Sequence, residues 1–356
     1  MAGYYLGVDI HKRFSQVAVM DRQGVVVEQR RVEHADREGL REYFARYAGS
    51  QVAMEATVGW PWMADELEGL GLRLRLAHPA AVPLIARSRL KSDQVDAQVL
   101  AHLLRTDFLP EAYLAPPEVR DRRELLRTRL GLVGMQTMVK NRVHGLLIRC
   151  GEFFPGSDLF AARGLAWLRA VELPPCKRQV LDLWLGVLEM IRERVQRLTK
   201  HLYRWLGERE EVRLLQTIPG VGPITAWTLL AEIGEIERFP SPKKLSAYAG
   251  LVPYTRQSAQ KLWQDRLCKQ GNAFLRAAMV EAAWAALRGD PGLGARFQGL
   301  TKRMGPQKAI IVIARTLLEI AFAVLSERRA YRPFALRRGR RLRATVAGPG
   351  SASPAL

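Results

Sequence analysis

The stretch YYLGVDIHKRFSQVAVM, residues 4–20, decides the fold that we expect for the start of the chain. It contains two apolar, β-branched runs, Tyr4–Ile10 and Ser15–Met20, which are typical of strands. Turn-forming residues occupy positions 21–24, and Val25–Val32 then predicts a third strand. Because the three runs are joined by short polar breaks, we expect them to form a meander of neighbouring strands.

Helices and strands alternate after this meander. The expected elements are a polar helix over residues 36–47, a strand over 51–56, a helix over about 61–68, a strand over 72–77 and helices from residue 79 onward. Three meandering strands followed by helix, strand, helix, strand and helix is the order of a ribonuclease-H-like (RuvC-like) domain. We therefore expect an α/β domain of this class over residues 1–115.

The rest of the chain is predicted to be α-helical. Apolar residues recur with 3-4 spacing from Leu181 to Trp205, and an earlier set runs from Leu132 to Leu146, so residues 116–211 predict a helical coiled-coil region. Whether these helices pair within one chain or between two chains stays open. Residues 212–330 predict a mainly helical domain, and residues 331–356 a basic, partly disordered tail.

The composition favours a cytoplasmic protein that binds a polyanion. The chain has 55 Lys and Arg against 35 Asp and Glu, a formal net charge of +20, which points first to nucleic acid. The apolar stretch from Ala309 to Leu325 is interrupted by Arg315 and Glu319, so we expect no membrane span. There is no signal-peptide pattern, and three scattered cysteines predict neither disulfides nor a zinc site.

Four carboxylates in the first domain form a candidate metal site. Asp9 and Glu55 stand near the ends of two expected strands that are neighbours in a ribonuclease-H-like sheet. Asp93 and Asp96 lie three residues apart at an expected helix start, hence on one face. Oxygen ligands favour Mg²⁺, with Mn²⁺ as an alternative, and two such ions can activate a phosphodiester. Taken alone, an Asp pair at a helix start is usually only a cap and a favourable partner of the helix dipole.

Several residues are candidates for binding nucleic acid. Basic side chains just before the Asp pair would line the same cleft, and the stretch Ile-Pro-Gly-Val-Gly at 218–222 is similar to a helix-hairpin-helix element, whose glycines let the backbone approach phosphates. A plain tight turn is the alternative. The candidates are Arg87, Arg89, Lys91, Gly220, Gly222, Lys269 and Arg276. His11 and Lys12 receive no role from the sequence.

Seven motifs in order carry a resemblance to a known family. They are Gly-Val-Asp-Ile-His-Lys at 7–12, Met-Glu-Ala-Thr at 54–57, Lys-Ser-Asp-Gln-Val-Asp-Ala at 91–97, Ile-Pro-Gly-Val-Gly at 218–222, Ala-Gly-Leu-Val-Pro at 249–253 with Gln257-Ser258 downstream, Lys-Gln-Gly-Asn-Ala-Phe-Leu-Arg at 269–276, and residues 308–314. Over about residues 4–330 the chain resembles the insertion-sequence one-ten family of transposases. These are RNA-guided recombinases with an acidic RuvC-like domain and a serine-bearing transposase domain.

The resemblance implies a specific chemistry. Asp9, Glu55, Asp93 and Asp96 would be the catalytic, Mg²⁺-binding set, and Ser258 the nucleophile that forms a transient phosphoserine link to cleaved DNA. Donor and target DNA and a structured guide RNA would be partners, and the chain would act as a dimer or tetramer, near the bacterial nucleoid when active. The chain departs from the family at Ala259, where glycine usually follows the serine.

Two other functions stay open from the sequence. A junction-resolving RuvC-like nuclease would use water at the acidic site and leave Ser258 a bystander, with no covalent adduct. A non-catalytic nucleic-acid-binding scaffold would use the hairpin element and the basic tail, and it would be indifferent to divalent metal. From its chemistry alone, Ser258 is one hydroxyl in a polar loop, because serine is a weak nucleophile until it is activated.

Overall fold

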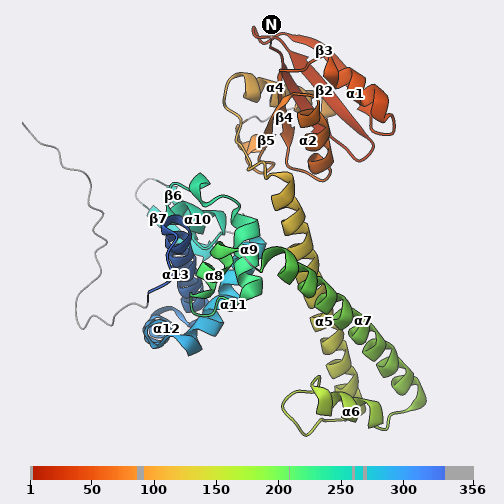
Figure 1. The fold of residues 1–356 in the computed structure, drawn as a ribbon, viewed down its shortest axis with the longest axis vertical. Helices are drawn as coiled ribbons and strands as arrows, with labels where there is room; N and C mark the ends of the chain where they lie inside the picture. The colour runs from red at the N-terminus through yellow and green to blue at the C-terminus, as the bar shows by residue number, and fades with distance from the viewer. Residues whose placement is uncertain (1–2, 86–91, 208, 259–260, 268–270, 333–356) are drawn as a thin grey trace, which may run out of the picture. The chain divides into compact units, whose positions relative to one another are not determined.

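Figure 1 shows the computed structural model of the chain, which describes residues 3–85, 92–207, 209–258, 261–267 and 271–332. The chain divides into two compact units, Met1–Pro116 and Pro117–Leu356.

The first unit is a five-stranded mixed sheet with helices. Its elements are β1 (Tyr5–Ile10), β2 (Phe14–Met20), β3 (Val26–Glu33), α1 (Arg37–Ala45), β4 (Gln51–Glu55), α2 (Trp60–Gly69), β5 (Arg73–Ala77), α3 (Val82–Ile85) and α4 (Asp93–Arg105). The strand order is β3-β2-β1-β4-β5. β2 is antiparallel to both β1 and β3, whereas β4 is parallel to both β1 and β5. The expected α/β domain with three meandering strands is confirmed.

The sheet buries a different set of residues on each face. Alternation along β1 sends Leu6 and Val8 into a core that also contains Phe44 of α1 and Leu67 of α2. Helix α4 covers the opposite face, where Leu100 packs with small residues of the strands. The central strands are therefore covered on both faces, and only their ends remain for a site.

The second unit begins with two long helices, α5 (Pro117–Cys150) and α7 (Pro175–Leu206), joined through α6 (Ala162–Ala170). The two long helices run side by side in opposite directions and share an apolar core (Figure 1). Most of the expected α7 seam is buried or packed against an apolar core, but Trp205, at its end, is 39% exposed. On α5, Met135 of the earlier set is 52% exposed. Leu185, outside the expected seam, is buried because the intervening segment and α6 also pack on the pair and widen its buried face.

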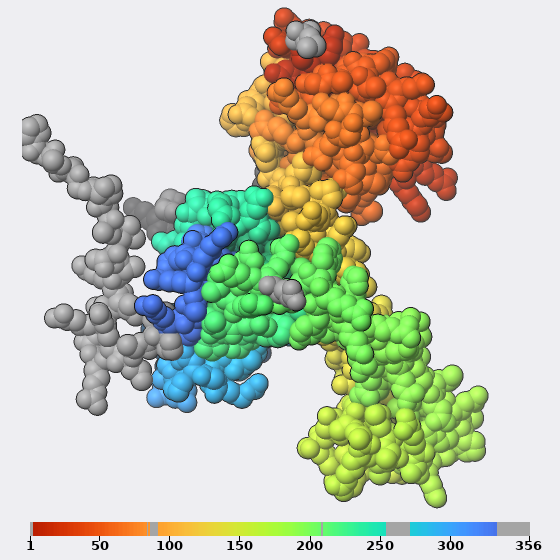
Figure 2. Space-filling model, in the orientation of Figure 1, coloured from red at the N-terminus to blue at the C-terminus, as the bar shows by residue number. Residues whose placement is uncertain are grey.

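The remainder is mainly helical, as expected. Its elements are α8 (Glu210–Gln216), α9 (Pro223–Ile233), a 3-10 turn η1 (Ile236–Arg238), α10 (Pro242–Tyr248), β6 (Pro253–Ser258), β7 (Lys261–Leu267), α11 (Ala273–Gly289), α12 (Pro291–Met304) and α13 (Pro306–Glu327). They form the packed body coloured green to blue in Figure 2. Helix α13 is, among described residues, the one helix long and apolar enough to cross a membrane, yet 56% of its apolar window is buried inside this core.

The antiparallel ribbon of β6 and β7 corrects the sequence prediction of a polar loop around Ser258. Residues 253–258 and 261–267 carry polar groups at both alternating positions, so the period-2 pattern that marks a half-buried strand is missing. The element is recognised from its backbone pairing. Ser258 pairs with Lys261, so it lies at the end of the ribbon that is farthest from Pro253.

The core between α5 and α7 yields the first prediction. Leu188 is fully buried and Leu183 is 67% exposed, although both lie on α7. Leu188→Ala is expected to lower the free energy of unfolding by about 2–5 kcal/mol, because it leaves a cavity. Leu183→Ala is the matched control and should change it by no more than about 0.5 kcal/mol. Urea denaturation followed by circular dichroism measures both, and equal losses would contradict the packing described.

Candidate active site

The parallel pairing of β1 and β4 brings Asp9 and Glu55 to the same edge of the sheet. The register pairs Val8 with Met54, and Asp9 and Glu55 are the next residues along the two strands. Val8 and Met54 point into the core beneath α1 and α2. Because side chains alternate along a strand, the two carboxylates belong to the opposite face, which α4 covers.

Helix α4 supplies the other two predicted carboxylates. Its N-cap is Ser92, whose Oγ accepts a hydrogen bond from the Val95 amide at 3.3 Å. Asp93 and Asp96 follow in the first turn. A helix N-terminus favours negative charge, so this end of α4 tolerates two carboxylates close together.

Gly7 allows α4 to lie directly against β1. A Cβ built on Gly7 would overlap the carbonyl oxygen of Ala97 and would lie 2.6 Å from the Ala101 amide nitrogen. Any other residue at position 7 would push the helix away from the strand. The missing side chain therefore sets the depth of α4, and with it the distance from Asp93 to Asp9.

His11 lies between the two acidic residues. Its Nε2 is 3.1 Å from Asp9 Oδ2 and 3.1 Å from Asp93 Oδ2. The ligand atoms of these three residues lie within 4.8 Å of one another. The ring also stacks on Phe14, with 4.7 Å between the centroids. The sequence analysis gave His11 no role; its position two residues after Asp9, in the turn between β1 and β2, was the one available signal.

Burial and the repulsion between carboxylates make the ionised form of Asp9 unfavourable. Burial raises the pKa of Asp9, His11 lowers it, and the carboxylates of Asp93 and Asp96 raise it further. The side chains of Asp9, His11 and Asp93 are 21%, 37% and 49% exposed, so solvent and a substrate phosphate have access. A divalent cation fits this donor set, because it would offset the repulsion between carboxylates.

Glu55, like Asp96, lies outside the cluster of ligand atoms formed by Asp9, His11 and Asp93. The strand register sets it beside Asp9, but it is not one of the three residues whose ligand atoms gather within 4.8 Å. Its side chain is partly buried and is engaged in an interaction of its own. The structure thus brings together Asp9 and Asp93 and adds His11, while Asp96 acts on the charge of Asp9 without belonging to the cluster.

The predicted nucleic-acid contacts divide into three groups. Arg87, Arg89, Lys91 and Lys269 lie outside the described residues, as does Ala259. Gly222 is exposed at the N-cap of α9, with open space where a Cβ would be. Gly220 has φ +80°, and a Cβ there would overlap the carbonyl oxygen of Ala282 in α11.

Two of these residues have an internal structural role; for Gly220 it is the tight turn that the sequence left open as an alternative, and for Arg276 the sequence did not indicate it. Gly220 is required by its turn and by the close packing of that turn on α11. Arg276 is partly buried, and its Nη1 donates a hydrogen bond to the carbonyl of Ala249 at 3.1 Å. Arg276 therefore stabilises the segment that leads into β6.

Comparisons with known families agree with this organisation. A sequence model described as "Transposase IS116/IS110/IS902 family" matches residues 212–298. A second model, of IS110 transposases with a DEDD domain and described as "Transposase", matches residues 6–151. The chain belongs to the IS110 family of transposases. It is thus a transposase, an enzyme of DNA strand transfer, and the resemblance stated from the motifs is confirmed.

Similar proteins extend over nearly the whole chain. The transposase for insertion sequence element IS1111A of Coxiella burnetii is 29% identical over 342 residues, covering 92% of this chain and 91% of the relative. A probable family 20 transposase of Pseudomonas aeruginosa is 27% identical and covers 92% of this chain and 98% of its own length. A pilin gene-inverting protein of Moraxella bovis is 38% identical over 124 residues, covering 33% of this chain and 38% of the relative.

Membership in the IS110 family explains the unfavourable charges of the first unit. A DEDD nuclease domain implies a divalent metal. The cluster of Asp9, His11 and Asp93 has the donor atoms and the solvent access that such an ion needs.

The contact of Gly7 with α4 yields a prediction about the site. Gly7→Ala is expected to lower the free energy of unfolding by about 1–3 kcal/mol, because the added methyl group overpacks the interface. It should also abolish metal-dependent DNA cleavage by moving Asp93 away from Asp9. Gly69→Ala is the control, since a Cβ there meets open space. Full cleavage activity in Gly7→Ala would show that the depth of α4 does not matter.

The raised pKa of Asp9 yields a second prediction. A carboxyl whose pKa is higher in the folded than in the unfolded state destabilises the fold when ionised. Asp9→Asn should therefore raise the Tm of the metal-free protein at pH 7, by about 2–4 °C for each kcal/mol of relief. The gain should shrink as the pH falls toward 3.8, the unfolded value.

The same variant should lose function. We expect Asp9→Asn to lower metal-dependent cleavage at least about a hundredfold, because the loss of a mere hydrogen-bond partner of a metal ligand already costs about 10–100-fold. Glu42→Gln, which alters an exposed carboxylate on α1, should change neither the Tm at pH 7 nor the metal-dependent cleavage. A lower Tm for Asp9→Asn at pH 7 would identify Asp9 as a structural partner of His11 instead.

Proposed function

We propose that this transposase is guided by a structured RNA and that it cleaves and rejoins DNA through Ser258, with Mg²⁺ bound by Asp9, Glu55, Asp93 and Asp96. Mn²⁺ would serve as a substitute. The observation that carries the proposal is the gathering of Asp9 and Asp93 within one ligand cluster at the sheet edge, from elements far apart in sequence. The assignment of Ser258 as the nucleophile is supported by the order of the sequence motifs around it.

Each residue would have a defined task at the acidic site. The carboxylates of Asp9 and Asp93 would hold the cation, and Asp96 and Glu55 would complete its shell. His11, within 3.1 Å of both carboxylates, would orient them or serve as a further ligand. The bound cation would polarise the scissile phosphate and stabilise the charge that develops in the transition state.

The strand transfer would need no energy-rich cofactor, because each step exchanges one phosphate ester bond for another. Ser258 Oγ would attack the phosphorus atom and lose its proton, while the departing DNA oxygen would leave as a hydroxyl group. The resulting phosphoserine would retain the energy of the broken phosphodiester. A hydroxyl of the exchanged strand would then attack the same phosphorus and release the serine, which rejoins the DNA.

Charge and packing support the partners that we propose. The net charge of +20 suits a complex with guide RNA and with donor and target DNA, bound through Arg87, Arg89, Lys91, Lys269 and the exposed N-cap at Gly222. Base pairing would carry the sequence information, while the protein would read backbone and shape. A relative's name, pilin gene-inverting protein, states a DNA rearrangement that requires rejoining as well as cleavage.

The helix pair supports an oligomer. Met135, Met138, Leu183 and Met190 are exposed apolar side chains on α5 and α7. We propose that this pair is a coiled-coil region that joins copies into a dimer or tetramer, between a RuvC-like domain (1–115) and the serine transposase domain (212–330). The complex would work in the bacterial cytoplasm, at the nucleoid.

An adduct assay tests the proposed chemistry. Purified protein is mixed with RNA transcribed from its flanking DNA, labelled donor and target duplexes and Mg²⁺, and is then separated under denaturing conditions. We expect a protease-sensitive labelled band that disappears in Ser258→Ala, while RNA binding stays within about twofold of the wild type because the hydroxyl contacts the DNA only.

The contrary outcomes have distinct meanings. Cleaved DNA without an adduct, and equally fast in Ser258→Ala, would favour the nuclease that uses water at the acidic cluster. The cluster has donor atoms that would hold the cation such a reaction needs, which makes this the second candidate function. Indifference to every divalent metal would instead favour a scaffold that only binds nucleic acid.

A further inference from the structure

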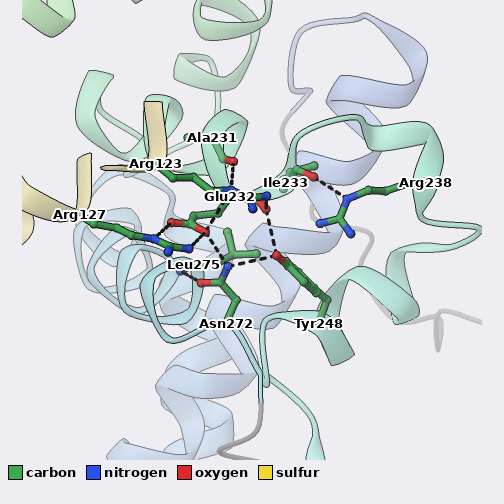
Figure 3. A network of polar contacts seen from close by, with 9 residues as sticks. All are labelled: Arg123, Arg127, Ala231, Glu232, Ile233, Arg238, Tyr248, Asn272 and Leu275. Atoms are coloured by element: carbon green, nitrogen blue, oxygen red, sulfur yellow. Dashed lines mark hydrogen bonds and ion pairs between the residues drawn. The ribbon is translucent and has the colours of Figure 1, made fainter. Parts of the chain in front are cut away.

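A buried carboxylate lies at the base of the β6–β7 ribbon. Glu232, in the last turn of α9, is only 1% exposed. Arg127 of α5 donates two hydrogen bonds to it, from Nε to Oε1 and from Nη2 to Oε2, both at 2.8 Å. Arg123, one turn earlier, donates to the backbone carbonyls of Ala231 at 2.7 Å and Glu232 at 3.0 Å. Figure 3 shows these groups converging on one point.

Glu232 also holds the residues that flank the ribbon, through its carboxylate and its backbone carbonyl. Asn272 Nδ2 donates to Glu232 Oε2 at 2.7 Å. The Tyr248 hydroxyl donates to the Glu232 carbonyl and accepts from Asn272 Nδ2, both at 3.3 Å. The Asn272 amide donates to the Tyr248 carbonyl at 2.7 Å. Glu232 thus connects α5 with both ends of the segment that contains β6 and β7 (Figure 3).

This connection closes the base of the ribbon. Tyr248 lies five residues before the start of β6, and Asn272 lies five residues after the end of β7. Between them, Gly271 packs directly on the backbone of Gly250: a Cβ on Gly271 would lie 2.5 Å from Gly250 Cα. The two strands therefore leave the protein body from a tightly defined point.

The ribbon needs such a base because it has little other support. Within the part of the chain that the structure describes, β6 and β7 contact each other far more than any other element, and an isolated two-stranded hairpin is only marginally stable. Ser258 lies five residues after Pro253, which is roughly 17 Å along the strand. A rotation of about 10° at the base would move the far end by about 3 Å, whereas displacements of about 1 Å already slow a reaction strongly.

We propose that Glu232 and Asn272 are positioning residues that fix the direction of the ribbon relative to α5, and hence the position of Ser258. The inference rests on the proposed role of Ser258. A fully buried carboxylate is costly unless its partners are all in place, and apolar packing would join α9 to α5 equally well. The carboxylate adds a directional link to Asn272, which apolar contacts do not provide.

An exchange of acid and amide tests the link without removing the helix cap. Asn272 also caps α11, since its Oδ1 accepts from the Leu275 amide at 3.0 Å. Asn272→Asp keeps that cap but sets a second carboxylate against Glu232. The double variant Asn272→Asp/Glu232→Gln again has one acid and one amide, with the original net charge. Asp290→Asn, at the N-cap of α12, is the matched control remote from the ribbon.

Two measurements separate positioning from general stability. Hydrogen exchange of the amides in residues 253–258 and 261–267 reports on the ribbon in the free protein. The rate of adduct formation at saturating DNA, together with the half-saturating DNA concentration, reports on the serine. In Asn272→Asp we expect at least about tenfold faster exchange in the ribbon and a similar loss of rate, because a charge-assisted hydrogen bond is replaced by repulsion.

The remaining expectations make the test specific. Hydrogen exchange in α9 and α13 and the half-saturating DNA concentration should stay unchanged. In the double variant, the exchange rate of the ribbon and the rate of adduct formation should both return to within about threefold of the wild type. Unchanged ribbon exchange in Asn272→Asp, or a double variant no better than the single one, would overturn the proposal. If the wild type forms no adduct while the ribbon responds as expected, the serine chemistry fails and the anchoring of the ribbon stands.

Discussion

A helix can rest on a strand at backbone distance only where the strand has no side chain, and Gly7 provides that place on β1. The carbonyl of Ala97 occupies the volume that a Cβ would fill. This contact sets where α4 begins relative to the sheet edge, so that Asp93 meets Asp9 and His11. Neither strand nor helix forms the site alone. The acidic cluster depends on how closely two elements pack, and one glycine decides that distance.

The acidic cluster and the ribbon base handle buried charge in opposite ways. Burial and neighbouring carboxylates raise the pKa of Asp9, and His11 lowers it. Glu232 is more deeply buried, yet two arginines and an asparagine satisfy it. A solvent-accessible carboxylate that is repelled by neighbouring carboxylates suits a site that binds a cation. A fully paired group suits a joint that has to keep its direction. The same residue chemistry therefore supports catalysis in one unit and geometry in the other.

The sequence predicted the sheet well because its signals are local. Apolar runs mark β1, β2 and β4, and the strand-end carboxylates Asp9 and Glu55 follow from the topology. Other features depend on tertiary packing and left no local pattern. His11 gains its place only when α4 docks, and the sequence of β6 and β7 has no alternating apolar pattern. The sequence predicted that Arg276 contacts nucleic acid, but its guanidinium donates a hydrogen bond to the carbonyl of Ala249 inside the fold. For Gly220 the sequence left a phosphate contact and a plain tight turn open, and only the packing on α11 shows that the turn needs a glycine.

The central claim is that side chains from β1 and α4 form one metal site. Titration of Mn²⁺ into the metal-free protein, followed by electron paramagnetic resonance of the free ion, tests it most directly. The account predicts saturable binding in the wild type and in Glu42→Gln, and loss of that binding in both Asp9→Asn and Asp93→Asn. Equal Mn²⁺ binding by all four proteins would contradict it, because the ion would then bind elsewhere.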